Sequence, residues 1–351
     1  MKPEIHGGNI YKYDHKVYDF SANLNPQGMP TAAKKALIES IDQYESYPDP
    51  DCRELKSIIS RFHGVSEDRI CCGNGAADII FRIAMAFRPG SALIVAPAFS
   101  EYAEALELAG CRVEYLEMKE EDGFHVPQDI SDRVAGYDMV FICNPSNPTG
   151  IVVDRNVILS MASACSRGGG RLIVDECFAE FLENEGACSI LDCIENLSGI
   201  IVLKSFTKLF SMAGLRLGYC ICSDTEDCDA IDDTMQTWPV STASAKAGAA
   251  AMSAYKGDAP AVVAPERNRL KSGLKELGFK VYDSEANYVF FKSGFPLDEP
   301  LQTRGILIRN CANYHGLCQG YYRIAVRTYE ENSFLLEALR NICYNNTVTR
   351  L

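Results

Sequence analysis

Short apolar runs alternate with segments of helical periodicity through much of the chain. The apolar runs predict strands at residues 92–97, 112–116, 139–143, 172–175, 200–204 and 217–222. The periodic segments predict helices at residues 31–44, 54–62, 79–87, 156–165, 243–255 and 261–277. Because near-continuous apolar strands separated by helices are typical of a sheet buried on both faces, the pattern predicts an α/β fold with a mostly parallel sheet.

The pattern changes after Gly278, where strands at 287–292, 305–310 and 322–326 precede a closing helix at 330–344. This change predicts a second, smaller α+β domain. We expect a large domain at residues 46–244 and a small domain made of residues 1–45 and 245–351.

Composition excludes several classes of function. The formal charge of −13 argues against a nucleic-acid partner, because such proteins need a basic face. No apolar stretch approaches the roughly 18 residues that a membrane span needs, and the N-terminus has no signal-like apolar region. We therefore expect a cytoplasmic protein, in which clustered arginines stand out against the acidic background.

The chain has 15 cysteines, but they form no paired C-x-x-C motifs with histidine partners. Several lie inside apolar runs, as in Tyr219-Cys220-Ile221-Cys222, where a thiol behaves as a small hydrophobic group. The sequence predicts reduced core thiols and no metal site.

Lys208 is the first candidate for chemistry. It closes the motif Ser205-Phe206-Thr207-Lys208, directly after an apolar strand, and Arg216 follows within Ala-Gly-Leu-Arg-Leu-Gly. A buried lysine is a good nucleophile toward carbonyl groups, and the hydroxyls and guanidinium suit a phosphate. A solvated loop lysine is the alternative.

Three further segments add polar groups at strand ends. Asp175 ends an apolar strand in Val-Asp-Glu, where ligands collect in open α/β sheets, although it could simply cap a helix. Asn147 lies in Asn-Pro-Ser-Asn-Pro-Thr-Gly, which could also be plain turn chemistry. Gly73–Asp78 is glycine-rich before a helix, a weak signal for anion binding when it is taken alone.

Together and in this order, these segments resemble the fold-type-I enzymes of pyridoxal 5′-phosphate (PLP), in the aspartate aminotransferase superfamily. The resemblance runs from about residue 6 to residue 341. It implies PLP as the cofactor, a mostly parallel sheet in a large domain, a smaller α+β domain, and a homodimer with shared active sites.

The resemblance also implies a role for each matching residue. Lys208 is expected to attach the cofactor covalently and to move protons at the substrate carbon. Asp175 is expected to face the ring nitrogen, Asn147 the ring O3′ and Phe99 the ring face. The expected phosphate cup is Gly75, Ala76, Ser205, Thr207 and Arg216, with Tyr47 reaching the partner subunit's cofactor. Phe178 stands where many relatives have a tyrosine that helps Asn147.

Within the superfamily, several segments resemble the L-threonine-O-3-phosphate decarboxylases of cobalamin biosynthesis. They include the N-terminal His6-Gly7-Gly8-Asn9 and the C-terminal segments around Arg309 and Arg327. The resemblance implies release of CO₂ from L-threonine O-3-phosphate, giving (R)-1-amino-2-propanol O-2-phosphate. The expected substrate-binding residues are His6, Asn23, Asn147, Arg309, Arg323 and Arg327.

Two other functions remain open from the sequence. Other features suit the histidinol-phosphate aminotransferases, and a catalytically silent PLP-binding regulator is a third hypothesis. At the level of single residues, His6 could be a mobile terminal histidine, and Arg309 and Arg327 could be surface charges.

Overall fold

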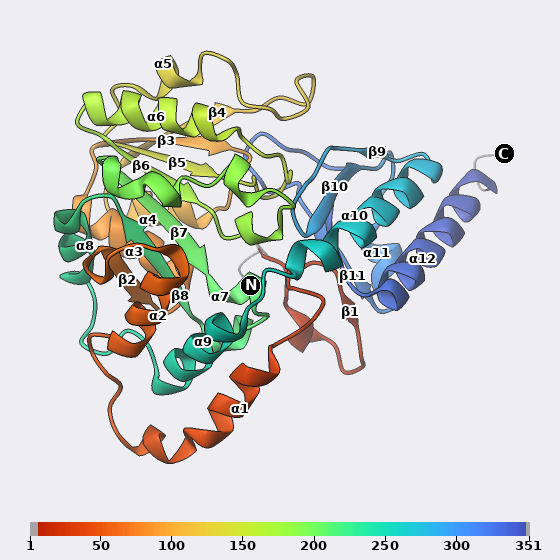
Figure 1. Ribbon diagram of the computed structural model, residues 1–351. Coiled ribbons are helices and arrows are strands. Elements are labelled where there is room, and N and C mark those ends of the chain that lie inside the picture. The colour runs from red at the N-terminus through yellow and green to blue at the C-terminus, as the bar shows by residue number, and fades with distance from the viewer. Residues whose placement is uncertain (1–5, 349–351) are drawn as a thin grey trace.

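A seven-stranded sheet forms the centre of the larger part of the molecule in the computed structural model, which describes residues 6–348 (Figure 1). Its strand order is β2-β8-β7-β6-β5-β3-β4. The strands are β2 (Ile70–Gly73), β3 (Ser91–Ala96), β4 (Arg112–Glu117), β5 (Met139–Cys143), β6 (Arg171–Asp175), β7 (Ile200–Ser205) and β8 (Gly218–Cys222). Only β8 runs antiparallel to its neighbours, so the predicted mostly parallel sheet is confirmed.

Helices cover both faces of this sheet because successive strand residues point to opposite sides. Phe141 and Ile173 pack in the hydrophobic cluster that includes helices α3 (Ala76–Phe87), α4 (Glu101–Leu108) and α8 (Thr225–Asp232). Val140, Ile142 and Val174 pack in the other cluster, with residues of α2, α6 and α9. These last helices are α2 (Arg53–His63), α6 (Arg155–Arg167) and α9 (Thr242–Ala254).

The second part of the molecule contains a four-stranded antiparallel sheet, ordered β12-β13-β10-β9. Its strands are β9 (Lys280–Val281), β10 (Tyr288–Lys292), β12 (Arg309–Asn310) and β13 (Tyr321–Ala325). A separate parallel pair joins β1 (Tyr18–Asp19) to β11 (Ile306–Leu307). Helices α10 (Ala259–Glu276) and α12 (Tyr329–Val348) pack against each other beside these strands (Figure 1). The remaining helices are α1 (Thr31–Glu39), α5 (Ile130–Val134), α7 (Phe206–Leu209) and α11 (Asp298–Gln302).

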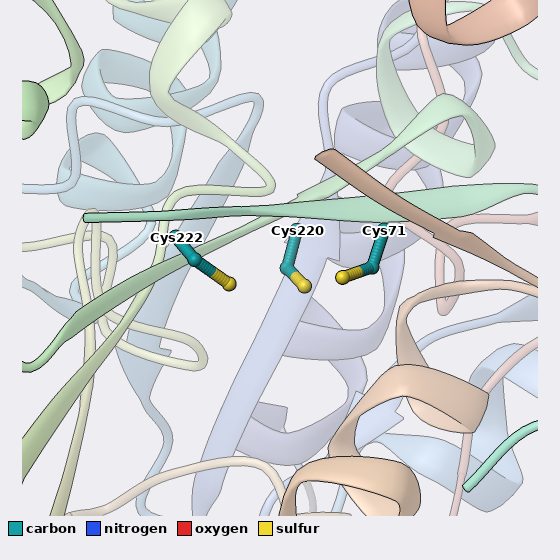
Figure 2. Close-up of side chains that lie close together, drawn as sticks. All are labelled: Cys71, Cys220 and Cys222. Carbon is teal, nitrogen blue, oxygen red and sulfur yellow. The ribbon is translucent and has the colours of Figure 1, made fainter. Parts of the chain in front are cut away.

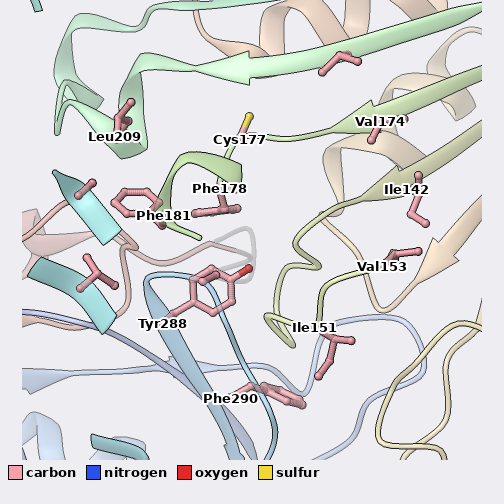
Figure 3. Close-up of a cluster of buried hydrophobic side chains, with 14 of the residues drawn as sticks. Ile142, Ile151, Val153, Val174, Cys177, Phe178, Phe181, Leu209, Tyr288 and Phe290 are labelled. Carbon is pink, nitrogen blue, oxygen red and sulfur yellow. The ribbon is translucent and has the colours of Figure 1, made fainter. Parts of the chain in front are cut away.

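One continuous hydrophobic core joins the two parts. Figure 3 shows Ile142 and Val174 from the large sheet in the same cluster as Tyr288 and Phe290 from β10. Phe178 lies between them, with its ring centroid 5.1 Å from that of Tyr288. The small sheet is therefore packed directly against the segment that follows β6, which positions its side chains relative to the strand ends.

Several element boundaries differ from the sequence prediction. The helix expected at 31–44 ends at Glu39, and a 3₁₀ turn follows at Ile41–Glu45. At the boundary, the Ser40 hydroxyl donates a hydrogen bond to the carbonyl of Ala36 at 2.7 Å, as is common at helix ends. The strand expected at 305–310 is divided between β11 and β12, which belong to different sheets. The predicted domain boundaries remain a prediction. None of the described helices combines the length and apolar character needed to cross a membrane.

Candidate active site

The carboxyl ends of β5, β6 and β7 define the site. These strands are parallel and in register, so that Cys143, Asp175 and Leu203 lie side by side. Each strand continues into a loop that carries a sequence-predicted residue. The register therefore brings Asn147, Asp175 and Lys208 to one edge of the sheet, as expected for open α/β sheets.

A pocket of about 240 Å³ opens at this edge, between the large sheet and the small one. The structure brings most of the predicted site residues together in its wall. They are His6, Asn23, Ala76, Phe99, Asn147, Asp175, Ser205, Thr207, Lys208, Arg216, Arg309 and Arg323.

Lys208 projects into the pocket from the short helix α7. Ser205 caps this helix, its hydroxyl accepting the N–H of Thr207 at 3.1 Å. Burial, together with the positive charges of Arg323 and Arg216, lowers the pKa of Lys208 to about 8, against opposing contributions from Cys177 and Asp175. A larger fraction of Lys208 is thus the neutral, nucleophilic amine near neutral pH.

Two donors hold the buried carboxylate of Asp175. The hydroxyl of Tyr102 donates to one oxygen, and the N–H of Cys177 donates to the other at 3.0 Å. Tyr102 is fully buried on α4, and its ring stacks on Phe141 with centroids 4.9 Å apart. Burial and the neighbouring Asp175 raise the pKa of Tyr102, so the phenol keeps the proton that it donates.

A cradle for an anion lies beside Lys208, at the N-terminus of α3. Gly75 precedes the helix with a φ of +91°, and a Cβ added there would lie 2.6 Å from an Arg216 guanidinium nitrogen. Only glycine therefore lets the guanidinium approach the backbone N–H groups that begin α3. Within the described residues, Arg216 forms no ion pair and donates to the carbonyl of Ala213 at 3.2 Å.

Asn147 is linked to the small sheet. Its side-chain oxygen accepts from the guanidinium of Arg323 and from the Tyr314 hydroxyl at 3.4 Å. This arrangement leaves the amide nitrogen of Asn147 as the group that can donate within the pocket. Tyr314 thus supplies a hydroxyl group next to Asn147, which Phe178 cannot do because it has none.

Arg309 and Arg323 face each other across β12 and β13, where they are direct cross-strand partners. Both are almost fully buried, at 8% and 5% exposure. Among residues 6–348, Arg323 donates only to neutral groups, including the Ser21 carbonyl at 2.8 Å, and its buried Nε has no partner there. Because like charges opposite one another are unfavourable, this pair favours an anionic ligand.

His6 and Phe99 form the outer wall. The His6 imidazole lies 2.9 Å from the Glu101 carboxylate, and its ring centroid is 5.4 Å from that of Phe99. His6 is therefore docked against the start of α4, opposite Arg309. Asn23 contributes a buried side-chain oxygen that no described residue hydrogen-bonds.

Two predicted residues lie elsewhere. Arg327 forms an ion pair with Glu331 at 2.9 Å and lies outside the pocket wall, so its contact with substrate stays a prediction that this position does not support. It follows the end of β13, where the alternation that places Arg323 inward no longer applies. Tyr47 is 77% exposed and stacks on Trp238 with centroids 4.1 Å apart, outside the pocket of its own chain.

Sequence reasoning missed two functional candidates, Tyr102 and Tyr314. The segment Glu101–Leu108 buries Tyr102, Ala105 and Leu106, an i, i+3, i+4 pattern that identifies a short amphipathic helix. Tyr314 follows Arg309 in a loop, where no periodic pattern marks it.

A family model described as aminotransferase class I and II matches residues 15–339. The chain belongs to this family. It is 36% identical to the threonine-phosphate decarboxylase of Salmonella typhimurium, over 96% of each chain. It is 31% identical to the histidinol-phosphate aminotransferase of Ruminiclostridium cellulolyticum, over 98% of each chain. The crystal structure of the histidinol-phosphate aminotransferase from Clostridium acetobutylicum is similar with a TM-score of 0.86 and 27% identity, covering 93% of this chain and 99% of that one. The fold and superfamily predicted from the sequence are confirmed.

The lowered pKa of Lys208 gives a first prediction for this family member. In protein freed of any bound aldehyde, we expect Lys208 to react with an acylating reagent with a midpoint near pH 8, well below the ordinary value of 10.5, because burial disfavours the ammonium. Labelling across the neutral and alkaline range, followed by peptide mass spectrometry, measures the midpoint. Lys35, an exposed residue of α1, corrects for the reagent's own pH dependence. A midpoint equal to that of an ordinary lysine would contradict the burial described above.

Proposed function

We propose that this chain is a PLP-dependent decarboxylase that converts L-threonine O-3-phosphate to (R)-1-amino-2-propanol O-2-phosphate and CO₂. The observation that carries the proposal is the cross-strand pair of Arg309 and Arg323 in the wall that contains Lys208. A substrate with a carboxylate and a phosphate needs more than one cation, and two guanidiniums in one wall meet that need. The similarity to threonine-phosphate decarboxylases over the whole chain supports the same assignment.

The residues present fit PLP. Lys208 provides the amine for covalent attachment, and Asp175 provides a fixed carboxylate for the ring nitrogen. Gly75, Ala76, Ser205, Thr207 and Arg216 provide a cradle for the phosphate, which the glycine keeps open for Arg216. When bound, PLP accepts the electron pair that a departing group leaves on the substrate carbon. Phe99 and Asn147 complete the set as ring-stacking group and O3′ donor.

The chain's own residues determine which bond breaks. Arg309, Arg323 and His6 hold the two anionic groups of the substrate and so fix its rotation. In decarboxylation, the bond between Cα and the carboxylate breaks, CO₂ leaves, and its bonding electrons stay on the substrate. Lys208, in its protonated form, then returns one proton to Cα.

Histidinol-phosphate aminotransferase activity is the second candidate. It is supported by the identity of 31% to one such enzyme and by the close similarity of a second in three dimensions. Both reactions use the same cofactor residues, so they differ in the orientation of the substrate. Because the cysteines of the described part of the chain are mostly buried and form no disulfide, we also propose that the enzyme acts in the reducing cytoplasm.

Substrate turnover separates these candidates. With PLP-loaded protein, we expect release of CO₂ from O-phospho-L-threonine and formation of the amine phosphate, measured by trapping of CO₂ and mass spectrometry. Lys208→Ala should abolish both, since the amine holds the cofactor and moves the proton. Rapid transamination of histidinol phosphate without CO₂ release would favour the aminotransferase, and binding of PLP with no turnover of either compound would favour a silent regulator.

The arginines provide a matched pair of variants. We expect Arg323→Gln to lower kcat/KM by about 100-fold or more, because it leaves an anionic group of the substrate without its buried partner. Arg327→Gln should keep kcat/KM within about threefold of the wild type, since it removes only a partly exposed ion pair with Glu331. Steady-state kinetics with O-phospho-L-threonine measures kcat/KM for both variants. Equal losses in the two variants would contradict the placement of Arg323 inside the pocket and Arg327 outside it.

We also propose a homodimer in which Tyr47 reaches the cofactor phosphate bound by the partner subunit. Tyr47 and Trp238 form an exposed aromatic stack, and Ile38, Ile41 and Tyr44 are exposed on the neighbouring segment. Exposed apolar groups in this number favour burial against another chain. A symmetric dimer would cover the same surface on both subunits and supply one tyrosine to each site.

Mixed dimers test the role of Tyr47. If Tyr47→Ala and Lys208→Ala are each inactive at limiting PLP, co-expression of the two chains should restore roughly a quarter of the wild-type activity. The hybrid has one site with an intact Lys208 and an intact tyrosine from the other chain. No recovery, in hybrids whose formation is verified by two affinity tags, would place Tyr47 in its own subunit's site or outside both.

A further inference from the structure

Four buried cysteines converge on the face of the large sheet that is covered by α3 and α8. Cys71 of β2 and Cys220 of β8 are direct cross-strand partners, and Cys222 lies two residues further along β8. Residues two apart point to the same face of a sheet, so all three thiols share one side. Figure 2 shows their sulfur atoms on the same side of the strands, with Cys71 and Cys222 turned toward Cys220.

Helix α8 adds a fourth thiol from above the sheet. The sulfur atoms of Cys228 and Cys71 lie 2.8 Å apart. The sulfur atoms of Cys71, Cys220 and Cys222 all lie within 4.8 Å of one another, and Cys71 also belongs to a second such group with Cys228 and Asp232. Cys71 is therefore the shared member of two potential ligand sets, all of whose thiols are at most 2% exposed.

The carboxylate of Asp232 is already engaged. It accepts from Arg82 at 2.9 Å and from Lys56 at 3.2 Å. Arg82 is 5% exposed and also donates to the Cys72 carbonyl at 2.9 Å, which places its charge between β2 and α8. The Nε of Arg82 is buried and has no hydrogen-bond partner in the described part of the chain. Arg82 is also paired with Asp78 at 3.6 Å, so two cations and two carboxylates lie beside the thiols.

We propose that Cys71, Cys220, Cys222 and Cys228 bind one Zn²⁺ ion as thiolates, in a closed structural site. Zinc prefers four tetrahedral thiolate ligands at about 2.3 Å, which places the sulfurs about 3.8 Å apart, within the spread of the Cys71 group. To complete this geometry, the Cys228 sulfur moves about 1 Å away from that of Cys71 and toward those of Cys220 and Cys222. Binding releases four thiol protons and leaves a formal charge of −2, next to the ion-paired cations Arg82 and Lys56.

Three of the four cysteines lie on the strands that carry the anion cradle. β2 leads directly into Gly75 and Ala76, and β8 begins just after Arg216, so the ligand strands carry both sides of the anion cradle. A metal ion that links β2, β8 and α8 fixes the spacing between these two sides. Because the thiols are buried, the ion enters while the chain folds and does not exchange readily afterwards.

Metal content is the direct test. Full-length protein, expressed in zinc-supplemented medium and washed with chelator, should contain about one zinc per chain by mass spectrometry of the elements. Cys220→Ser combined with Cys222→Ser should reduce the content at least about tenfold. Cys165→Ala, which removes a similarly buried thiol on α6, should leave it unchanged. Zinc-free wild-type protein after expression in zinc would overturn the proposal.

A second measurement needs no variant. Wild-type protein refolded with Co²⁺ should show the intense absorption of tetrahedral cobalt and the charge-transfer bands of thiolate ligands, at about one Co²⁺ per chain. Absence of these bands in protein that regains its native circular dichroism would overturn the proposal. A disulfide between Cys71 and Cys228, detected as a loss of about 2 Da with blocked thiols, would also overturn it.

Discussion

The parallel pairing of β5, β6 and β7 is the constraint on which the site depends. Their backbone hydrogen bonds place Cys143, Asp175 and Leu203 in one row, and each following loop starts from that row. The positions of Asn147, Asp175 and Lys208 are thus set by strand register, before any side chain contacts another. A shift of one residue in any pair would turn the inward side chains to the opposite face.

The sequence predicts this framework well because strands buried on both faces have continuous apolar residues. Lys208, Asp175 and Asn147 follow such strands directly, so their convergence could be expected. Arg327 could not be placed in the same way: β13 ends at Ala325, and beyond a strand end the alternation of faces does not continue. Tyr102 depends on an eight-residue helix, which is too short to give a strong periodic signal.

Long-range pairing is the other information that the linear sequence lacks. Arg309 and Arg323 become neighbours only through the register of β12 and β13, and Cys71 meets Cys220 only through that of β2 and β8. β12 and β13 are joined by a long loop in place of a tight turn, and β2 and β8 lie far apart in the sequence. The sequence separation within each pair therefore matches no recognisable motif. Only the folded structure shows that the paired side chains are neighbours.

Two arginines without carboxylate partners in the part of the chain that the structure describes give the pocket a positive charge within an acidic protein. The chain carries a formal charge of −13, yet Arg216 and Arg323 have no carboxylate partner within the described residues. In a partly buried pocket, such charges are screened less by salt than charges on the surface. The site therefore attracts a phosphorylated ligand locally, while the rest of the surface repels it.

The late position of β13 has a consequence for the synthesis of the protein. A nascent chain that has reached Gly294 contains the whole seven-stranded sheet, Lys208 and the anion cradle, but neither Arg309 nor Arg323. Since N-terminal segments fold first during translation, the cofactor half of the site forms on the ribosome before the two buried arginines that complete the substrate half are made. The ability to select a substrate is the last property that the growing chain acquires.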